Sequence, residues 1–386
     1  LSQEFVIGKD FKDIEKLSNL EEDAFSFDML GEAARTESQA ENYFNAYMNA
    51  IDEVGKLNLI KNLSNGVSIK ISALHPRYEM RKIHNLESVL IPKLLELIHY
   101  AKSKDVEITI DAEEQDRLSL SLHIIEMLAY DKALKDWPGF GIALQAYGKR
   151  SHDVIYWLNT MLEKREKMHL RLVKGAYWDY EIKHAQVSGY EGYPVFSKKS
   201  LTDISFLSCA RQILQNKKIY PKFATHNAHT ISSISFLAKD SPYEFQRLYG
   251  MGELLYKSAS EVLGLDKRPS IYAPIGNYKD LLPYLVRRLL ENGANSSFIN
   301  RLLDPETDSK WLAENPMVRM KKETKEIPLP KDIFNKRENS SGYDLTEDEN
   351  LKRLESSLAK FENALVDAES IYVGRVKSST SAHKAI

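Results

Sequence analysis

The chain has 386 residues, of which 43% are hydrophobic, and its formal net charge is −2. This length suits one large α/β domain with an appendage, because a chain of this size can bury an extensive core. The balanced charge and dispersed basic residues argue against nucleic acid as the main partner, and the single cysteine, Cys209, excludes an internal disulfide framework.

Short apolar segments recur between residues 25 and 275, and stretches with helical periodicity separate most of them. This alternation is typical of repeated βα units that build a parallel sheet. The predicted strands are 25–30, 67–72, 106–111, 140–145, 170–174, 222–227, 244–249 and 270–274. The predicted helices are 38–54, 87–103, 117–130, 151–164, 203–216, 229–238, 252–263 and 280–292. Eight such units predict a (β/α)₈ barrel, with a doubly wound open sheet as the alternative.

Polar residues lie near or just after the carboxyl ends of these strands. In chain order they are Glu32, Lys70, Asp111, Gln145, Arg171 with Lys174, Thr225 with His226, Gln246 and Tyr272. A (β/α)₈ barrel builds its active site at the carboxyl ends of its strands, so this shared position favours a site. Each residue alone also has an ordinary structural interpretation: Lys70 could face solvent, Asp111 could cap a helix, and His226 could satisfy loop backbone.

The stretch 175–202 is longer than most loops between a strand and a helix, and it is rich in aromatic residues such as Tyr177 and Trp178. An aromatic loop on the catalytic face could cover a flat ring system, or it could be a packing flap. Near its end, Lys198 and Lys199 could bind a phosphate or form a plain solvated pair.

The last predicted helix carries two adjacent arginines, Arg287 and Arg288. Tyr284 and Glu291 lie three or four residues from them, so all four side chains can share one sector of the helix. Two guanidinium groups there suggest a carboxylate partner. The alternative is a solvated face with ordinary helical ion pairs.

The remaining patterns limit the cofactor, the location and the domain boundaries. The sequence has no zinc-protease, P-loop or Rossmann phosphate motif, so a dinucleotide cofactor would be held in another way. No apolar run approaches the roughly 20 residues that span a bilayer, and the N-terminus lacks a signal pattern. We expect a lead-in helix over 1–24, a barrel over 25–303, a charged linker over 304–344, and a C-terminal helix and tail over 345–386.

Six motifs in order resemble the proline dehydrogenase domain of the bacterial bifunctional proline utilisation (PutA) proteins. They are VSIKISALHPRY at 67–78, IDAEEQDR at 110–117, RLVKGAYWD at 171–179, FATHNAHT at 223–230, YEFQRLYGMGE at 243–253 and YLVRRLLENGAN at 284–295. The resemblance implies a distorted (β/α)₈ barrel with its last helix over the mouth and FAD at the carboxyl face. It implies a flavoprotein oxidoreductase of proline catabolism that converts L-proline to 1-pyrroline-5-carboxylate by hydride transfer to the flavin, with electrons passed to a quinone.

The resemblance also implies a role for individual residues of this chain. Arg287, Arg288 and Lys70 would hold the proline carboxylate, and Glu32 would pair with Arg287 when the site is empty. The proline ring would be surrounded by Tyr177, Leu255, Tyr272 and Tyr284, with Asp111 and Ala176 nearby. The flavin would contact Gln145, Arg171, Val173, Lys174, Gly175, Trp178, Ser197, Lys198, Thr225, His226 and Glu291.

These residue types suit the chemistry that the resemblance implies. Hydride leaves the ring carbon only when the neighbouring nitrogen has a lone pair, so the site must favour the neutral amine while it anchors the carboxylate. Fixed guanidinium groups orient the carboxylate, and their positive field disfavours an ammonium nearby. Apolar tyrosine and leucine walls admit a small ring and exclude water.

The resemblance has consequences for location and partners. It implies a cytoplasmic protein with a peripheral contact on the cytoplasmic face of the inner membrane, and a reducing compartment agrees with the single Cys209. The bifunctional relatives continue into an aldehyde dehydrogenase domain. This chain contains no counterpart of that domain, so we expect no oxidation of the aldehyde product by it.

Two rival functions follow from the residues. A lysine at a barrel strand end is what a Schiff-base aldolase requires, and Lys70 and Lys174 both qualify. An interaction or DNA-binding scaffold is the non-enzymatic rival, and the lack of a basic patch argues against it.

Overall fold

The computed structural model describes residues 6–11, 23–61, 64–239, 241–265, 267–276, 278–293, 310, 313–324, 326–334, 336–362, 370–372 and 375–377. Eight parallel strands close into a barrel in chain order, and β1 pairs with both β2 and β8. The strands are β1 (Phe25–Met29), β2 (Gly66–Ile69), β3 (Glu107–Ile110), β4 (Phe140–Gln145), β5 (Met168–Val173), β6 (Ile219–Ala224), β7 (Glu244–Leu248) and β8 (Ser270–Ile275). The (β/α)₈ prediction is confirmed, and the open-sheet alternative is wrong because Phe25 pairs with Ile271 across the closure.

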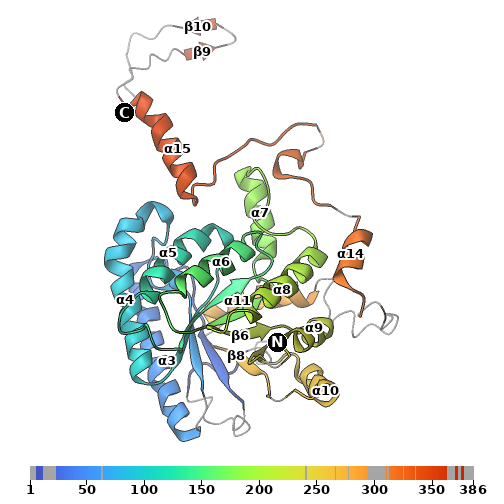
Figure 1. The fold of residues 1–386 in the computed structure, drawn as a ribbon. Helices are drawn as coiled ribbons and strands as arrows, with labels where there is room; N and C mark the ends of the chain where they lie inside the picture. The colour runs from blue at the N-terminus through green and yellow to red at the C-terminus, as the bar shows by residue number, and fades with distance from the viewer. Residues whose placement is uncertain are drawn as a thin grey trace.

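Helices surround the barrel (Figure 1). They are α3 (Glu37–Lys61), α4 (Ile83–Ser103), α5 (Leu118–Ala129), α6 (Ser151–Met161), α7 (Trp178–Ser188), α8 (Lys199–Leu214), α9 (Ala228–Ala238), α10 (Glu253–Leu263) and α11 (Tyr278–Gly293). Short 3₁₀ turns lie at Ile71–Ala73, Met80–Lys82, Gln115–Arg117, Pro330–Asp332 and Ala359–Phe361. Apolar residues of α3, α4, α5, α6, α8 and α9 belong to the same buried core as the strands; in α4, for example, Leu90, Leu94 and Leu97 are fully buried. Within the described residues, no helix has the length and apolar content needed to cross a membrane.

The stretch 175–202 is not a simple loop, because it contains α7. Apolar residues on one side of α7, Ile182 and Ala185, pack with Tyr147, Tyr193 and Val195 in a small separate cluster. The prediction of a long loop over 175–202 was wrong for residues 178–188. The apolar periodicity of α7 is weak, and packing in this cluster outside the barrel stabilises the helix. The packing interpretation of the aromatic residues is therefore correct for Tyr193.

The C-terminal region runs along the barrel and then leaves it. Helix α14 (Pro316–Lys322) contacts α8, and the Tyr193 hydroxyl donates to the Pro328 carbonyl at 2.7 Å. An ion pair of 2.6 Å between Arg150 and Glu347 precedes α15 (Asp348–Leu358). Helix α15 and the hairpin of β9 (Ser370–Tyr372) and β10 (Arg375–Lys377) extend away from the barrel (Figure 1). The boundaries at 24, 303 and 344 remain predictions, and residues 378–386 of the expected tail lie outside the described residues.

Candidate active site

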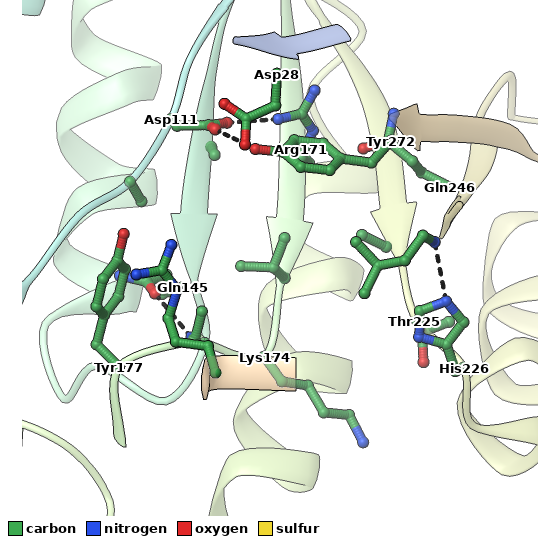
Figure 2. Close-up of a pocket in the computed structure, with 18 of the residues that line it drawn as sticks. Asp28, Asp111, Gln145, Arg171, Lys174, Tyr177, Thr225, His226, Gln246 and Tyr272 are labelled. Atoms are coloured by element: carbon green, nitrogen blue, oxygen red, sulfur yellow. Dashed lines mark hydrogen bonds and ion pairs between the residues drawn. The ribbon is translucent and has the colours of Figure 1, made fainter. Parts of the chain in front are cut away.

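A cavity of about 1330 Å³, counting its open mouth, lies at the carboxyl ends of the strands. Most of the residues predicted for the site line it: Lys70, Asp111, Gln145, Arg171, Val173, Lys174, Gly175, Ala176, Tyr177, Thr225, His226, Tyr272, Tyr284, Arg287 and Arg288. In Figure 2, Asp28, Asp111, Arg171 and Tyr272 gather at one end of the cavity, while Gln145 with Tyr177 and Thr225 with His226 occupy opposite sides. The barrel thus brings residues from all its strands to one hollow.

Lys70 belongs to a buried cluster of charges. Its Nζ lies 2.6 Å from Asp28 Oδ1 and 3.3 Å from Asp111 Oδ2. The Tyr272 hydroxyl donates to the same Asp111 oxygen at 2.7 Å. Burial by itself would lower the pKa of Lys70, but Asp28, Tyr272 and Asp111 together raise it well above its ordinary value. Lys70 is therefore an ammonium, which argues against its use as a Schiff-base nucleophile, since that role needs a neutral amine.

Arg171 crosses the barrel interior from β5 and is almost fully buried. Its guanidinium donates to Asp111 Oδ1 at 2.6 Å, to Ser26 Oγ at 2.7 Å and to Ser68 Oγ at 3.1 Å, and it lies 5.0 Å from the centre of the Tyr272 ring. Hydroxyls from the first two strands and a carboxylate directly after the third thus hold the planar guanidinium in one orientation.

Helix α11 brings its arginine pair to the mouth of the cavity. Arg287 makes a bidentate ion pair with Glu32, with N–O distances of 2.6 and 3.1 Å, and its guanidinium lies 4.8 Å from the Tyr177 ring centre. Burial favours a raised pKa for Glu32, but the charge and hydrogen bonds of Arg287 outweigh it and leave that pKa below its ordinary value. Arg288 is 8% exposed and lies over the Tyr284 ring. The expected pairing of Glu32 with Arg287 is present.

Three further lining residues, Gln145, Gly175 and His226, are held in place by the protein around them. Gln145 donates to the Glu113 carbonyl at 2.7 Å and accepts from the Ala176 amide at 3.1 Å. Gly175 has a φ of 138°, a conformation that favours glycine, and a Cβ there would lie 2.5 Å from the Tyr147 ring. His226 accepts a hydrogen bond from the Leu248 amide at 3.0 Å, so its Nε2 has a structural task as well as a place in the cavity.

Several predicted residues are not among those that line the cavity: Glu32, Leu255, Trp178, Ser197 and Lys198. Glu32 instead forms the ion pair with Arg287, which does line the cavity. Leu255 packs against the barrel core, and the Trp178 indole donates to the Phe196 carbonyl at 2.9 Å. Lys198 forms an ion pair of 2.8 Å with Glu326, and Lys199, the next residue, lines the cavity instead. Direct contact of these residues with a ligand remains a prediction, and the Glu291 side chain lies outside the described residues.

Four lining residues with polar side chains have no ligand-binding role predicted from the sequence: Asp28, Asn227, Gln246 and Arg247. Asp28 sits inside the apolar strand β1 and is 1% exposed. A carboxylate within an otherwise buried strand requires a cation, and that was the available signal. Gln246 was noted only as a polar residue at a strand end.

Glu181, on α7 behind the cavity, has a strongly altered acidity. Burial raises its pKa from 4.5 to about 8, although the Gln115 amide at 2.7 Å and the Tyr147 hydroxyl at 3.2 Å both donate to Oε1. The folded state therefore holds a proton that the unfolded state has lost at neutral pH.

This difference predicts a pH-dependent stability. Between the ordinary carboxyl pKa and the folded pKa of about 8, the folded state binds more protons, so stability falls as pH rises through this window. We expect Glu181 to contribute a loss of about 3 kcal/mol between pH ~5.5 and ~8. Glu181→Gln, which mimics the protonated acid, should remove that loss. Urea unfolding of both proteins at the two pH values measures it, and equal pH slopes would contradict the assignment.

Comparisons with known proteins agree with this geometry. Residues 11–301 match the family described as proline dehydrogenase. The bifunctional protein PutA of Escherichia coli is 43% identical over 385 residues, which cover 93% of this chain and 29% of that protein. Proline dehydrogenase 1 of Bacillus subtilis is 28% identical over 280 residues, covering 71% of this chain and 80% of that protein.

Solved structures give the same result. A crystal structure described as bifunctional PutA has a TM-score of 0.88 and 41% identity, covering 95% of this chain and 39% of that one. PutA from Bdellovibrio bacteriovorus, inactivated by N-propargylglycine, has a TM-score of 0.83 and 26% identity, covering 98% of this chain and 41% of that one. The chain spans less than a third of the length of the Escherichia coli protein and about two fifths of the two solved chains. The chain belongs to the proline dehydrogenase family.

Proposed function

We propose that this chain oxidises L-proline to 1-pyrroline-5-carboxylate, with FAD as the hydride acceptor, as the first step of proline catabolism. The observation that carries the proposal is the convergence of Arg287, Arg288 and Lys70 on one cavity in a barrel of the proline dehydrogenase family. A small carboxylate is the ligand that such a set of cations recognises best.

The cavity has groups that fit a flavin. Gln246 Oε1 and Arg171 Nε are buried at its lining and have no hydrogen-bond partner among the described residues. Gln246 Oε1 could accept from an N–H group of a flavin ring, and Arg171 Nε could donate to one of its carbonyl or nitrogen acceptors. Ala143 and Ala224 are small enough to leave room for a flat ring, and Lys199 adds a positive charge suited to a phosphate. FAD, when bound, would supply the two-electron acceptor.

The residues of the chain would bind the substrate and set its protonation. Arg287 and Arg288 come from α11, and Lys70 from the end of β2, so a carboxylate between them would be held from two directions. The same positive field would favour the neutral amine that hydride loss requires. The rings of Tyr272 and Tyr284 would limit the pocket to a small cyclic substrate and exclude water.

The test is spectroscopic. Purified protein should carry the visible absorption of oxidised flavin, and anaerobic L-proline should bleach that band while D-proline leaves it intact. A colourless protein that gains no flavin on reconstitution would overturn the cofactor assignment. A yellow protein that L-proline does not reduce would overturn the substrate assignment alone.

We extend the proposal to the partners that the resemblance implies. A quinone would receive the electrons, the protein would work in the cytoplasm with a peripheral contact at the inner membrane, and the full-length polypeptide would include an aldehyde dehydrogenase domain. The names of the PutA relatives, which describe them as bifunctional, support the last point.

A further inference from the structure

Ser72 and Glu113 form a buried pair beside the cavity without being among the residues that line it. They follow β2 and β3, and they are 1% and 5% exposed. Glu113 Oε1 accepts from the Ser72 amide at 3.1 Å, and Oε2 accepts from the Ser72 hydroxyl. Arg117 Nη1 also donates to Oε2 at 2.7 Å, so both carboxylate oxygens are engaged. A buried carboxylate that is fully hydrogen-bonded in this way holds its neighbours in one geometry.

The first neighbour that this pair holds is the loop that carries Glu32. Ser72 Oγ accepts from the Ala33 amide at 2.8 Å, and the Ser72 carbonyl accepts from the Ala34 amide at 2.9 Å. Because the Ser72 hydroxyl donates its hydrogen bond to Glu113, the lone pairs of Ser72 Oγ are left to accept from Ala33. Ala33 has a φ of 51°, a left-handed conformation that costs a residue with a side chain about 1 kcal/mol. The hydrogen bonds that Ser72 accepts from Ala33 and Ala34 therefore stabilise the backbone that directs Glu32 toward Arg287.

The second neighbour lies on the other side of the same ion pair. The Glu113 carbonyl accepts from Gln145, whose Oε1 accepts from the Ala176 amide. The next residue is Tyr177, whose ring lies under Arg287 and whose hydroxyl is 3.5 Å from Glu32 Oε2. Two chains of hydrogen bonds thus start at Glu113 and end at backbone amides beside Glu32 and Tyr177, the two residues that contact Arg287.

We propose that Ser72 and Glu113 are positioning residues that set how firmly Glu32 holds Arg287, and hence how readily Arg287 is released to a substrate carboxylate. The inference rests on the proposed function, because it treats Arg287 as a carboxylate ligand. An apparent dissociation constant scales inversely with the fraction of protein in the competent state. Loosening the Glu32 loop should therefore tighten the binding of a carboxylate.

The test is a double-mutant cycle on the flavin-loaded protein, with tetrahydrofuran-2-carboxylate as a cyclic carboxylate that has no oxidisable nitrogen. Calorimetry should show Kd falling by about 3- to 10-fold for Ser72→Ala and by a similar factor for Glu32→Ala. The double variant should bind no tighter than Glu32→Ala, because Ser72 acts only through Glu32. Glu113→Gln, which keeps the shape of the side chain, should shift Kd in the same direction by a smaller factor.

A matched control is Ser151→Ala, which removes another buried hydroxyl, 3.3 Å from Ser205 Oγ and outside the cavity. It should leave Kd unchanged even if it lowers the melting temperature as much as Ser72→Ala does. Additive effects of Ser72→Ala and Glu32→Ala, or an unchanged Kd in either single variant, would overturn this inference and leave the proposed function intact. A parent protein that holds flavin but binds no cyclic carboxylate would overturn both.

Discussion

Replacing Arg288 with methionine should raise the KM for L-proline by about 30- to 1000-fold while flavin stays bound. The guanidinium is buried at the mouth of the cavity, where a charge-assisted contact to a carboxylate is worth about 2–4 kcal/mol. Methionine keeps most of the aliphatic length but removes the charge and every donor. Steady-state kinetics with flavin content measured from the absorption spectrum of the same samples separates substrate binding from cofactor loss.

Two further variants make this result specific. Arg288→Lys keeps the charge but loses the planar fork, so it should recover only part of the affinity. Arg81→Met removes an arginine whose side chain is 60% exposed and paired with Glu79, and it should leave KM unchanged. If Arg288→Met kept the parental KM, Arg288 could not be part of the carboxylate clamp.

Asp111→Ala should destabilise the fold by about 3–5 kcal/mol, because it removes one partner from a buried set of charges. Asp111 accepts from Lys70, Arg171 and Tyr272 at 3.3, 2.6 and 2.7 Å. Without Asp111, Lys70 would keep Asp28 as its ion-pair partner among the described residues. Arg171 would keep hydrogen bonds to the hydroxyls of Ser26 and Ser68. Urea unfolding of the parent and the variant at neutral pH measures the difference.

The matched control is Asp52→Ala at the surface. Asp52 also meets two cations, Lys56 and Lys104, each at 2.9 Å, but their side chains are 58% and 38% exposed. Solvent screens these pairs, so the variant should lose less than about 1 kcal/mol. Similar losses in the Asp111 and Asp52 variants would mean that burial of the cluster adds nothing to its strength.

Much of the barrel could be predicted because strand and helix periodicity are local properties. Every predicted strand is present, although β2 ends at Ile69 and β6 begins at Ile219. The first shift arises because Ile71–Ala73 turns into a 3₁₀ helix. Helix α7 was missed since it depends on packing against Tyr193 and Val195, which lie beyond its own end.

In the candidate site, too, the residues that local position identifies were predicted, and those that depend on contacts between distant segments were not. Position at the end of a strand identified Lys70, Asp111, Gln145 and Arg171, because a parallel barrel brings all such ends to one face. The arginine pair of α11 needed the family resemblance, since a helical pattern alone allows a solvated face. Asp28 was missed because alternation within an apolar strand does not show which residue will face the cavity.

By itself, the sequence determined the barrel class, the residues available at its mouth and the family to which the chain is similar. Only the tertiary structure decided which opposite charge each cation meets: Asp28 for Lys70, and Glu32 for Arg287, 255 residues away along the chain. The physical reason is that periodicity reports how each segment buries its own apolar side, whereas ion pairs form only after β1 closes against β8 and α11 comes over the mouth.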